Sequence, residues 1–591
     1  MLYIRKYAFI KNLIIIICFF LLTVLINSQM IRFGLNGLGD LRWHIGWVQN
    51  FSEQLKEGII YPRWLANTNF GYGSPTFVFY PPFVYYVGSI LRIMGFNSQQ
   101  TMTLLFSLPI FLSGITFYIY GKSKWGTISA FGGALSYMLC PFIINSVNFG
   151  NLSTLWAIPL LPLGVIFTDK CIENSKYGFL LTLSTFIIAL THTPTLLIYA
   201  IAWLLYIIYK TQEKPIINIL ITVIFAFGGL GLASFYLLPA ILEQRYVNID
   251  YQLGSMGGFA TVSVQDLFAL NGGYSIVAKN VIATIAIGIV SLIYYRKKKL
   301  YFRHIIGWII FIFMVLFMVS NLSEVIWFSS NTLLKVQRSA RIMGLFYFGQ
   351  AALFSLLITS FLGLKTKLKL IPITILISIL LVNFQHGYNL TRQSPGLNAN
   401  TRGTVFIKEW MEIALFEPIS GKLLDVPEFR PKISSPYEFN PDVRESTPIV
   451  DGIPIPKITG GNAYFPVPKL GQPNMEVLEG DSNITIENWS SYVRDFKLNV
   501  NQPSTIKIRT YYYPAWNLKI NDEIQDIKIL EDGTIGFFLE KGLYQGKLTY
   551  SMTPALIWGI LLTLLSLILG LVFHVKLNNY PFRLKNKSDG K

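Results

Sequence analysis

The chain contains 591 residues, of which 52% are hydrophobic and only 14% are charged. Soluble domains carry about 25% charged residues, so this composition excludes an ordinary soluble domain and predicts a polytopic α-helical membrane protein. The formal net charge is +18. Much of the basic excess falls in short connectors between hydrophobic segments, where basic residues mark membrane topology, and we therefore exclude nucleic-acid binding.

The first hydrophobic run follows three basic residues, Arg5, Lys6 and Lys11, which predict a cytoplasmic N-terminus. We expect an uncleaved membrane anchor, because Asn27-Ser28-Gln29 is a poor match to a cleavage site of small residues. Residues 28–100 then form a long polar and aromatic loop on the outer side of the membrane.

Hydrophobic runs along the chain predict about twelve transmembrane helices. With that number, the basic connectors and both termini all fall on the cytoplasmic side. The apolar segment 77–96 would add one more span and break this agreement. We therefore interpret it, with Pro81-Pro82 inside it, as an interfacial or re-entrant helix on the outer side. The alternative is that one of the shorter runs is not a span. The predicted spans lie near residues 8–27, 101–120, 126–145, 152–168, 177–191, 194–209, 217–240, 279–295, 304–321, 341–362, 369–385 and 553–575.

A long polar segment precedes the last hydrophobic run and divides the chain into three parts. We expect residues 1–385 to form a transmembrane core and residues 386–551 an extracytoplasmic, mainly β domain. Residues 552–591 then form the final helix and a basic cytoplasmic tail. The protein is predicted to be an integral membrane protein.

The polar segment begins with a helical pattern at 405–416 and a proline-rich stretch at 427–468. Alternating hydrophobic residues follow, with turn residues at Asn521-Asp522-Glu523 and Asp532-Gly533. This pattern predicts a small β-sandwich held between two membrane spans.

Asp40 and His44 are the first candidates for catalysis. In Gly39-Asp40-Leu41-Arg42-Trp43-His44, the carboxylate and the imidazole share one face of a predicted helix at a spacing of four. A carboxylate at the outer membrane face can act as a general base, and a carboxylate with a nearby imidazole can also begin a divalent metal site. The structural alternative is that Asp40 only caps the start of the helix.

The same outer loop carries an aromatic and basic motif, Tyr61-Pro62-Arg63-Trp64, followed by Tyr80 before Pro81-Pro82. Glycine and proline at this density specify a fixed, irregular loop, and the aromatic residues suit contact with lipid. Arg63 is a candidate for binding a phosphate. The alternative is that its side chain reaches toward lipid headgroups.

Four more polar residues lie at the outer ends of predicted spans and are candidates for binding substrate: His192, Glu243, Arg338 and Arg341. Charges at a membrane boundary are costly, so they mark a substrate path or a buried pair. The structural alternatives are a capped turn at His192 and an ion pair between Glu243 and Arg341. No nucleotide-binding motif is found, so an enzyme acting outside must use a donor that is already activated there.

These motifs resemble a known family. The first outer loop, with Asp40, His44, Tyr61-Pro62-Arg63-Trp64 and Phe79-Tyr80-Pro81-Pro82-Phe83, is similar to that of bacterial membrane proteins called 6-pyruvoyl-tetrahydropterin synthase-related. That group is part of the GT-C superfamily of glycosyltransferases that use polyprenyl-phosphate sugars. Gln337-Arg338-Ser339-Ala340-Arg341 resembles a motif of the same group with an altered middle. The outer segment Tyr511-Tyr512-Tyr513-Pro514-Ala515-Trp516 is similar to that of the related YfhO-like proteins.

The resemblance implies a GT-C-like fold in which the acidic residue of the first outer loop, here Asp40, is the catalytic base. It implies a polyprenyl-phosphate-linked sugar as donor, membrane lipid as surroundings, and a glycan, lipid or protein acceptor outside the cytoplasm. No cofactor is certain, although a divalent metal fits the chemistry. The segment 148–156 lacks an arginine and a glutamate that the group often has, which argues against a second acidic site.

Two non-enzymatic readings remain open. The chain is compatible with a transporter or flippase of lipid-linked glycans, although such a protein would carry charges within several spans rather than at their ends. It is also compatible with a factor for the assembly of cell-envelope polysaccharide, whose outer domain binds polymer.

Overall fold

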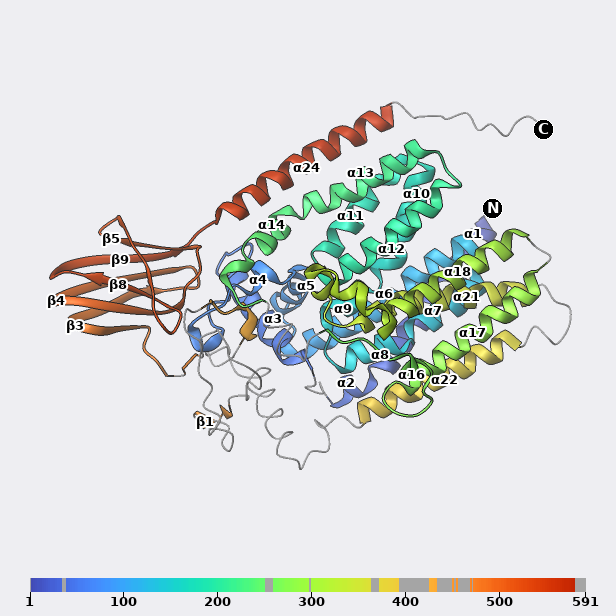
Figure 1. Cartoon of the computed structure of the whole chain (residues 1–591), viewed down its shortest axis with the longest axis horizontal. Coiled ribbons are helices and arrows are strands. Elements are labelled where there is room, and N and C mark those ends of the chain that lie inside the picture. The colour runs from blue at the N-terminus through green and yellow to red at the C-terminus, as the bar shows by residue number, and fades with distance from the viewer. Residues whose placement is uncertain are drawn as a thin grey trace.

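The computed structural model describes residues 2–33, 39–249, 259–296, 299–362, 371–392, 425–432, 449–450, 453–454, 468–469 and 471–579. Two bodies are visible in Figure 1, a bundle of helices and a β-sheet, with the elements of the first outer loop between them. The predicted helical pattern at 405–416 lies outside the described residues.

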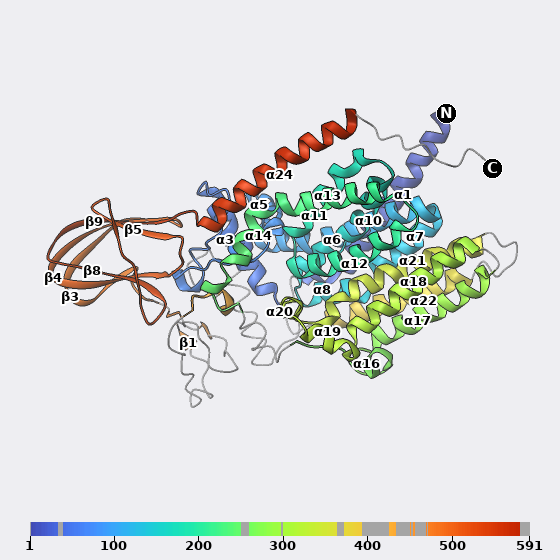
Figure 2. The same cartoon turned by 45° about the horizontal axis from the view of Figure 1, so that its top comes forward.

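The helices of the bundle are mostly apolar. They are α1 (Leu2–Ile26), α6 (Ser98–Trp125), α7 (Thr127–Met138), α8 (Pro141–Asn148), α9 (Leu152–Ala157), α10 (Leu160–Glu173), α11 (Gly178–Ala189), α12 (Thr193–Thr211), α13 (Ile216–Leu232), α14 (Ser234–Leu242), α17 (Ser275–Tyr295), α18 (Lys299–Val319), α21 (Met343–Leu362), α22 (Ile371–Arg392) and α24 (Pro554–Asn579). Further helices lie in the loops: α2 (Ser28–Phe33), α3 (Leu41–Lys56), α4 (Thr76–Phe79), α5 (Phe83–Ile93), α16 (Val264–Phe268), α19 (Glu324–Phe328) and α20 (Asn331–Leu334). Figure 2 shows α17, α18 and α22 along one side of the bundle and α24 along the other.

Within the described residues, nine helical segments are long and apolar enough to cross a membrane, and a bent pair makes a tenth. These segments confirm a polytopic helical membrane protein. Of the other two predicted spans, 177–191 corresponds to α11, which is 12 residues long, and 369–385 falls on α22. The number of twelve spans stays a prediction. Segment 77–96 contains α5, whose 11 residues are too short to cross the bilayer.

The predicted span 217–240 is not one straight helix. It is broken at Ala233 into α13 and α14, which meet at an angle of 69°. A broken helix leaves backbone groups unsatisfied in lipid unless a neighbour binds them. Thr563 of α24 does so, because its hydroxyl accepts a hydrogen bond from the Phe235 N–H at 3.1 Å. Gly559 permits this contact, since a Cβ there would lie 2.6 Å from the Ser234 carbonyl oxygen.

The β domain is a single antiparallel sheet that curls into a half-barrel, so the predicted two-sheet sandwich is wrong. Its strands are β3 (Met475–Trp489), β4 (Val493–Tyr511), β5 (Trp516–Ile520), β6 (Glu523–Gln525), β7 (Lys528–Ile529), β8 (Thr534–Leu539) and β9 (Gly542–Tyr550). A further pair, β1 (Ile449–Val450) and β2 (Ile453–Pro454), lies apart.

One long strand explains the curl of the sheet. The first half of β4 pairs with β9 and its second half with β8, while β3 runs along its other edge. Two neighbours on one edge turn the sheet around β4 instead of building a second sheet. The predicted turn at Asn521-Asp522 is confirmed, with φ values of 50° and 67° between β5 and β6.

The two ends of the bundle differ. The start of α1 and the end of α24 both lie at the end remote from the β-sheet (Figure 1). The first outer loop, with α3, α4 and α5, lies at the other end, next to the sheet. The predicted orientation in the membrane would place this second end outside.

Candidate functional site

The backbone before α3 holds Asp40 against another loop. Gly39 has φ +59°, and a Cβ at this position would lie only 2.0 Å from the Phe149 carbonyl oxygen. The Asp40 N–H donates a hydrogen bond of 3.1 Å to that same oxygen. A glycine is therefore required before Asp40, and the 149–150 turn fixes the position of the Asp40 backbone.

The Asp40 side chain does not act as a helix cap. Asp40 occupies the N-cap position of α3 with φ −83° and ψ −3°, but its carboxylate makes no capping hydrogen bond with the described first turn of that helix. The residue is exposed. The capping alternative is therefore wrong for the side chain.

Tyr80, after α4, lies between two opposite charges. Burial raises the pKa of its phenol to about 12, while the charge of Asp40 raises this pKa and the charge of Arg341 lowers it. Both charges are thus close enough to act on this phenol, which stays neutral at physiological pH.

His44 is buried directly beneath this group. Its Nδ1 lies 2.6 Å from the Tyr85 hydroxyl, and a second hydrogen bond joins its ring to the Gly150 backbone. Burial lowers the pKa of His44 to about 3. The ring is therefore neutral and occupied on both sides, and it ties α3 to α5 and to the 149–150 turn. The predicted part of His44 in catalysis stays a prediction.

Two more of the predicted residues reach the same place. His192 precedes α12, and its Nδ1 lies 2.7 Å from the Thr195 hydroxyl. Burial, then the charge of Arg341, then His44 hold the pKa of His192 well below its ordinary value. Arg341 donates from Nη1 to the Val336 carbonyl at 3.0 Å, which anchors one side of its guanidinium. Arg338 lies beside it and is exposed.

The structure thus brings together Asp40, His44, Tyr80, His192, Arg338 and Arg341, which we call the outer cluster. These residues come from four regions: the starts of α3 and α12, the link between α4 and α5, and the approach to α21.

Arg63 and its motif lie elsewhere, against the β domain. The Arg63 guanidinium donates to the Ser551 carbonyl at 3.0 Å and lies over the Tyr550 ring at 5.2 Å. Trp64 packs edge-on against Trp516 with ring centroids 5.4 Å apart. Tyr61 donates its hydroxyl to the Phe77 carbonyl at 2.6 Å. All three side chains hold the first outer loop to itself or to the sheet.

Glu243 also belongs to this junction. Its buried carboxylate accepts hydrogen bonds from the hydroxyls of Tyr513 and Thr553, on the β domain and at the entry to α24. The predicted ion pair with Arg341 is wrong, since no such pair occurs among the described residues and Glu243 is instead bound by hydroxyls. We call Arg63, Glu243, Tyr513 and Tyr550 the junction cluster.

A buried carboxylate that sequence reasoning missed completes the first outer loop. Asp425 accepts a hydrogen bond of 2.8 Å from the Trp47 indole and another from the Thr76 hydroxyl. Its neighbour Arg430 donates from Nε to the Asn69 side-chain oxygen at 3.2 Å. Both residues come from a segment of irregular composition, where only the fold reveals which loop they enter.

The described residues contain no group of three or more histidine, cysteine, aspartate or glutamate side chains able to hold a metal ion. A role for a divalent metal therefore stays an untested expectation.

Comparison with known proteins gives two partial likenesses. An uncharacterized protein of Lactococcus lactis subsp. cremoris (strain MG1363) is 25% identical over 264 residues, covering 42% of this chain and 42% of that protein. The match therefore spans less than half the length of that relative. ArnT from Cupriavidus metallidurans bound to undecaprenyl phosphate has a TM-score of 0.37 and 12% identity, over 70% of this chain and 77% of that chain. A likeness at this level carries no assignment of fold or activity.

A family model gives a broader result. The 6-pyruvoyl-tetrahydropterin synthase related domain, described as a membrane protein, matches residues 77–392. This range is more than half of the chain and includes Tyr80, His192, Glu243 and Arg341, while Asp40 lies before it. The chain therefore belongs to the 6-pyruvoyl-tetrahydropterin synthase related family of membrane proteins, as the motifs of its first outer loop predicted.

Proposed function

We propose that the protein is a glycosyltransferase that moves a sugar from a polyprenyl-phosphate donor to an acceptor outside the cytoplasm. The observation that carries the proposal is the outer cluster, in which an exposed carboxylate and an arginine act on the same tyrosine at the end of the helical bundle. A base and an anion-binding cation in one place are the two groups that this transfer requires.

Asp40 would act as the general base. Its carboxylate takes the proton of the acceptor hydroxyl while that oxygen attacks the anomeric carbon of the donor sugar. The bond between the anomeric carbon and the phosphate oxygen breaks, and its electron pair leaves with the polyprenyl phosphate. A single displacement of this kind inverts the configuration at the anomeric carbon.

Arg341 would stabilise the leaving phosphate, with Arg338 as a second cation at the rim. A guanidinium matches the geometry of a phosphate and binds it through two parallel hydrogen bonds. The proposal keeps Arg341 and not Arg63 for this role, because Arg63 is buried against Ser551 and Tyr550 in the junction cluster.

Tyr80 and His192 would bind the substrate as neutral groups. The phenol of Tyr80, with its pKa of about 12, stays protonated and can donate a hydrogen bond to a sugar oxygen. His192 stays uncharged beside Arg341, so it leaves the positive charge of that arginine to the phosphate.

The decisive experiment uses purified protein and a set of polyprenyl-phosphate sugars, and it measures the release of free polyprenyl phosphate. Asp40→Asn should abolish release, since a positioned general base contributes about 10²–10⁴-fold to a rate. The matched control is Asp522→Asn, an exposed aspartate in a β turn whose left-handed backbone asparagine tolerates.

Full activity of Asp40→Asn would remove Asp40 as the base. No release from any donor by well-folded wild-type protein would overturn the enzymatic proposal and favour a transporter or an assembly factor.

A further inference from the structure

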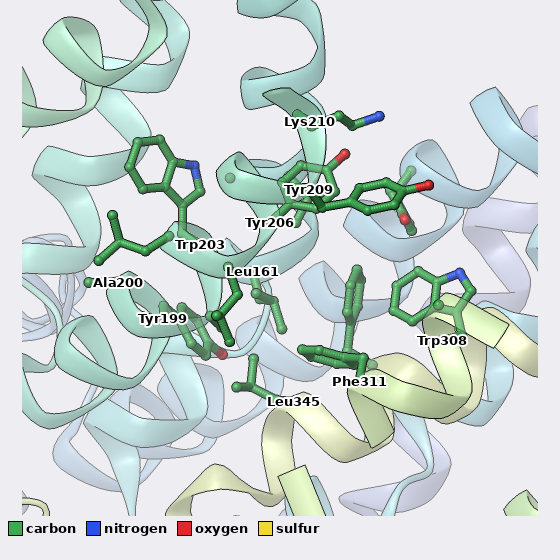
Figure 3. Close-up of a pocket in the computed structure, with 18 of the residues that line it drawn as sticks. Leu161, Tyr199, Ala200, Trp203, Tyr206, Tyr209, Lys210, Trp308, Phe311 and Leu345 are labelled. Carbon is green, nitrogen blue, oxygen red and sulfur yellow. The ribbon is translucent and has the colours of Figure 1, made fainter. Parts of the chain in front are cut away.

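A cavity of about 810 Å³ lies inside the helical bundle, and no residue of the outer cluster lines it. Figure 3 shows side chains on two sides of the cavity. Trp203 and Tyr199 of α12 lie on one side, and Trp308 and Phe311 of α18 lie on the other. Leu161 of α10 and Leu345 of α21 also line it. The lining is mostly apolar, so in a membrane the space favours hydrocarbon over water.

The cavity runs along almost all of α12. Its lining includes Leu196 near the start of this helix and Gln212 just after its end. At about 1.5 Å per residue, this stretch corresponds to about 24 Å, most of the roughly 30 Å depth of the hydrocarbon core. A single extended lipid chain fits a space of that length and character.

The end of the cavity remote from the outer cluster is cationic. Lys124, Lys210 and Arg303 line it there, whereas His192 lies at the opposite end of α12. Asp169 pairs with Lys124 at 2.7 Å and lies 3.7 Å from Lys210.

Among the described residues, the cations at this end outnumber the nearby carboxylates. Lys210 also lies 3.3 Å from Glu213, so the two lysines are paired with two carboxylates. Arg303 contacts neutral groups, the Gln212 side-chain oxygen at 3.2 Å and the Tyr209 ring at 5.9 Å. In this part of the described structure, three cations and two carboxylates therefore leave one positive charge beside the apolar space.

We propose that this cavity binds one anionic phospholipid, with its phosphate at Arg303 and Lys210 and an acyl chain among the aromatic residues of α12 and α18. The excess positive charge at one end favours an anionic headgroup, and the long apolar cavity favours a lipid over a free anion. The site goes beyond the proposed transfer, because its cationic end lies at the opposite end of α12 from His192 and no residue of the outer cluster lines it.

The test counts lipids that stay bound to purified protein by native mass spectrometry. Phosphatidylglycerol, phosphatidylcholine with the same acyl chains, and inorganic phosphate are added in turn. We expect one phosphatidylglycerol per protein, bound at least about fivefold tighter than phosphatidylcholine, since one basic residue near an anionic lipid contributes about that factor. Equal binding of both lipids, or displacement of phosphatidylglycerol by inorganic phosphate, would overturn the proposal.

Two pairs of variants locate the site. Arg303→Gln should weaken phosphatidylglycerol about fivefold and leave phosphatidylcholine unchanged. Its control, Arg245→Gln, removes another exposed arginine that stacks on a tyrosine ring, Tyr246 at 4.9 Å, and that does not line the cavity.

Gly307 lines the cavity, and a Cβ there meets no atom within 4 Å. Gly307→Leu should fill the space and reduce the binding of both lipids, whereas Gly570→Leu on the exposed face of α24, also with no atom within 4 Å, should not. Tight phosphatidylglycerol binding that survives both Arg303→Gln and Gly307→Leu would place the lipid elsewhere. If Gly307→Leu does not fold, Arg303→Gln decides alone.

Discussion

The outer cluster and the junction cluster both gather charged residues near the end of the bundle that faces the β domain, yet their surroundings differ. Arg63 and Glu243 are buried, and hydroxyls, a carbonyl and aromatic rings of the β domain surround them. Asp40 and Arg338 are exposed, and Arg341 is only partly buried. The outer cluster therefore has exposed charged side chains, whereas those of the junction cluster are buried.

This difference shows what a charge at a membrane boundary can mean. Such charges are costly to desolvate, and either a ligand or a structural contact compensates this cost. Arg63 and Glu243 hold the first outer loop and α14 to the β domain. The Asp40 backbone and the Arg341 guanidinium are each held by a hydrogen bond to a backbone carbonyl, and in the proposed transfer their charges act on the substrate.

The largest expected contrast is between two arginines. Arg341→Gln should lower kcat of the proposed transfer by about 10²–10³-fold, the usual effect of removing one group that stabilises a developing charge. Arg63→Gln should instead lower the thermal unfolding temperature while kcat changes by less than about threefold, since its lost contact to Ser551 contributes about 1–3 kcal/mol to folding.

Both variants are assayed for release of polyprenyl phosphate and for unfolding in the same detergent. A large loss of kcat in Arg63→Gln with an unchanged unfolding temperature would contradict a purely structural role for the junction cluster.

A second contrast concerns Glu243 and its hydroxyl partners. Glu243→Ala should destabilise the protein by about 3 kcal/mol, because it leaves the buried hydroxyls of Tyr513 and Thr553 without their acceptor. Combined with Tyr513→Phe, the effects should be non-additive by about 1–2 kcal/mol, as expected for residues in direct contact.

The measurement is the free energy of unfolding of the four proteins of this double-mutant cycle, with kcat as control. Strict additivity would show that Glu243 and Tyr513 act independently. A loss of kcat in Glu243→Ala without a loss of stability would indicate that Glu243 binds substrate.

The smallest expected effect is a pH dependence that comes from His44. Its pKa is about 3 in the folded protein and about 6.5 in an unfolded chain. The folded state therefore binds fewer protons between these values, and its stability is lost as the pH falls below 6.5. At pH 5 the loss relative to neutral pH is about 2 kcal/mol.

His44→Gln should keep a polar side chain between Tyr85 and Gly150 and flatten this dependence. Unfolding temperatures of wild type and variant between pH 7.5 and pH 5 test this. His192 is also held neutral and adds its own share, so His192→Gln should flatten the remaining dependence. An unchanged slope in both variants would contradict the burial of these rings as its cause.

The sequence by itself determined much of this protein. Composition and hydrophobic runs predicted the helical membrane core, since lipid selects apolar helices whatever their partners are. The distribution of the basic connectors argued against a span at 77–96, in agreement with the 11 residues of α5, and Asn521-Asp522 specified a turn through local backbone preference. Motif resemblance indicated the family. These features depend on the residue and its near neighbours in the chain.

Only the tertiary structure decided the rest. The bend at Ala233 depends on Thr563 and Gly559, more than 300 residues away, and the half-barrel depends on which strands share the edge of β4. Nothing in their local sequence distinguishes Arg63 from Arg341, because both are basic residues beside aromatic or apolar segments. What separates them is the partner that the fold brings near, a buried sheet for Arg63 and an exposed carboxylate for Arg341. Such contacts join residues distant in the chain, and no short-range pattern encodes them.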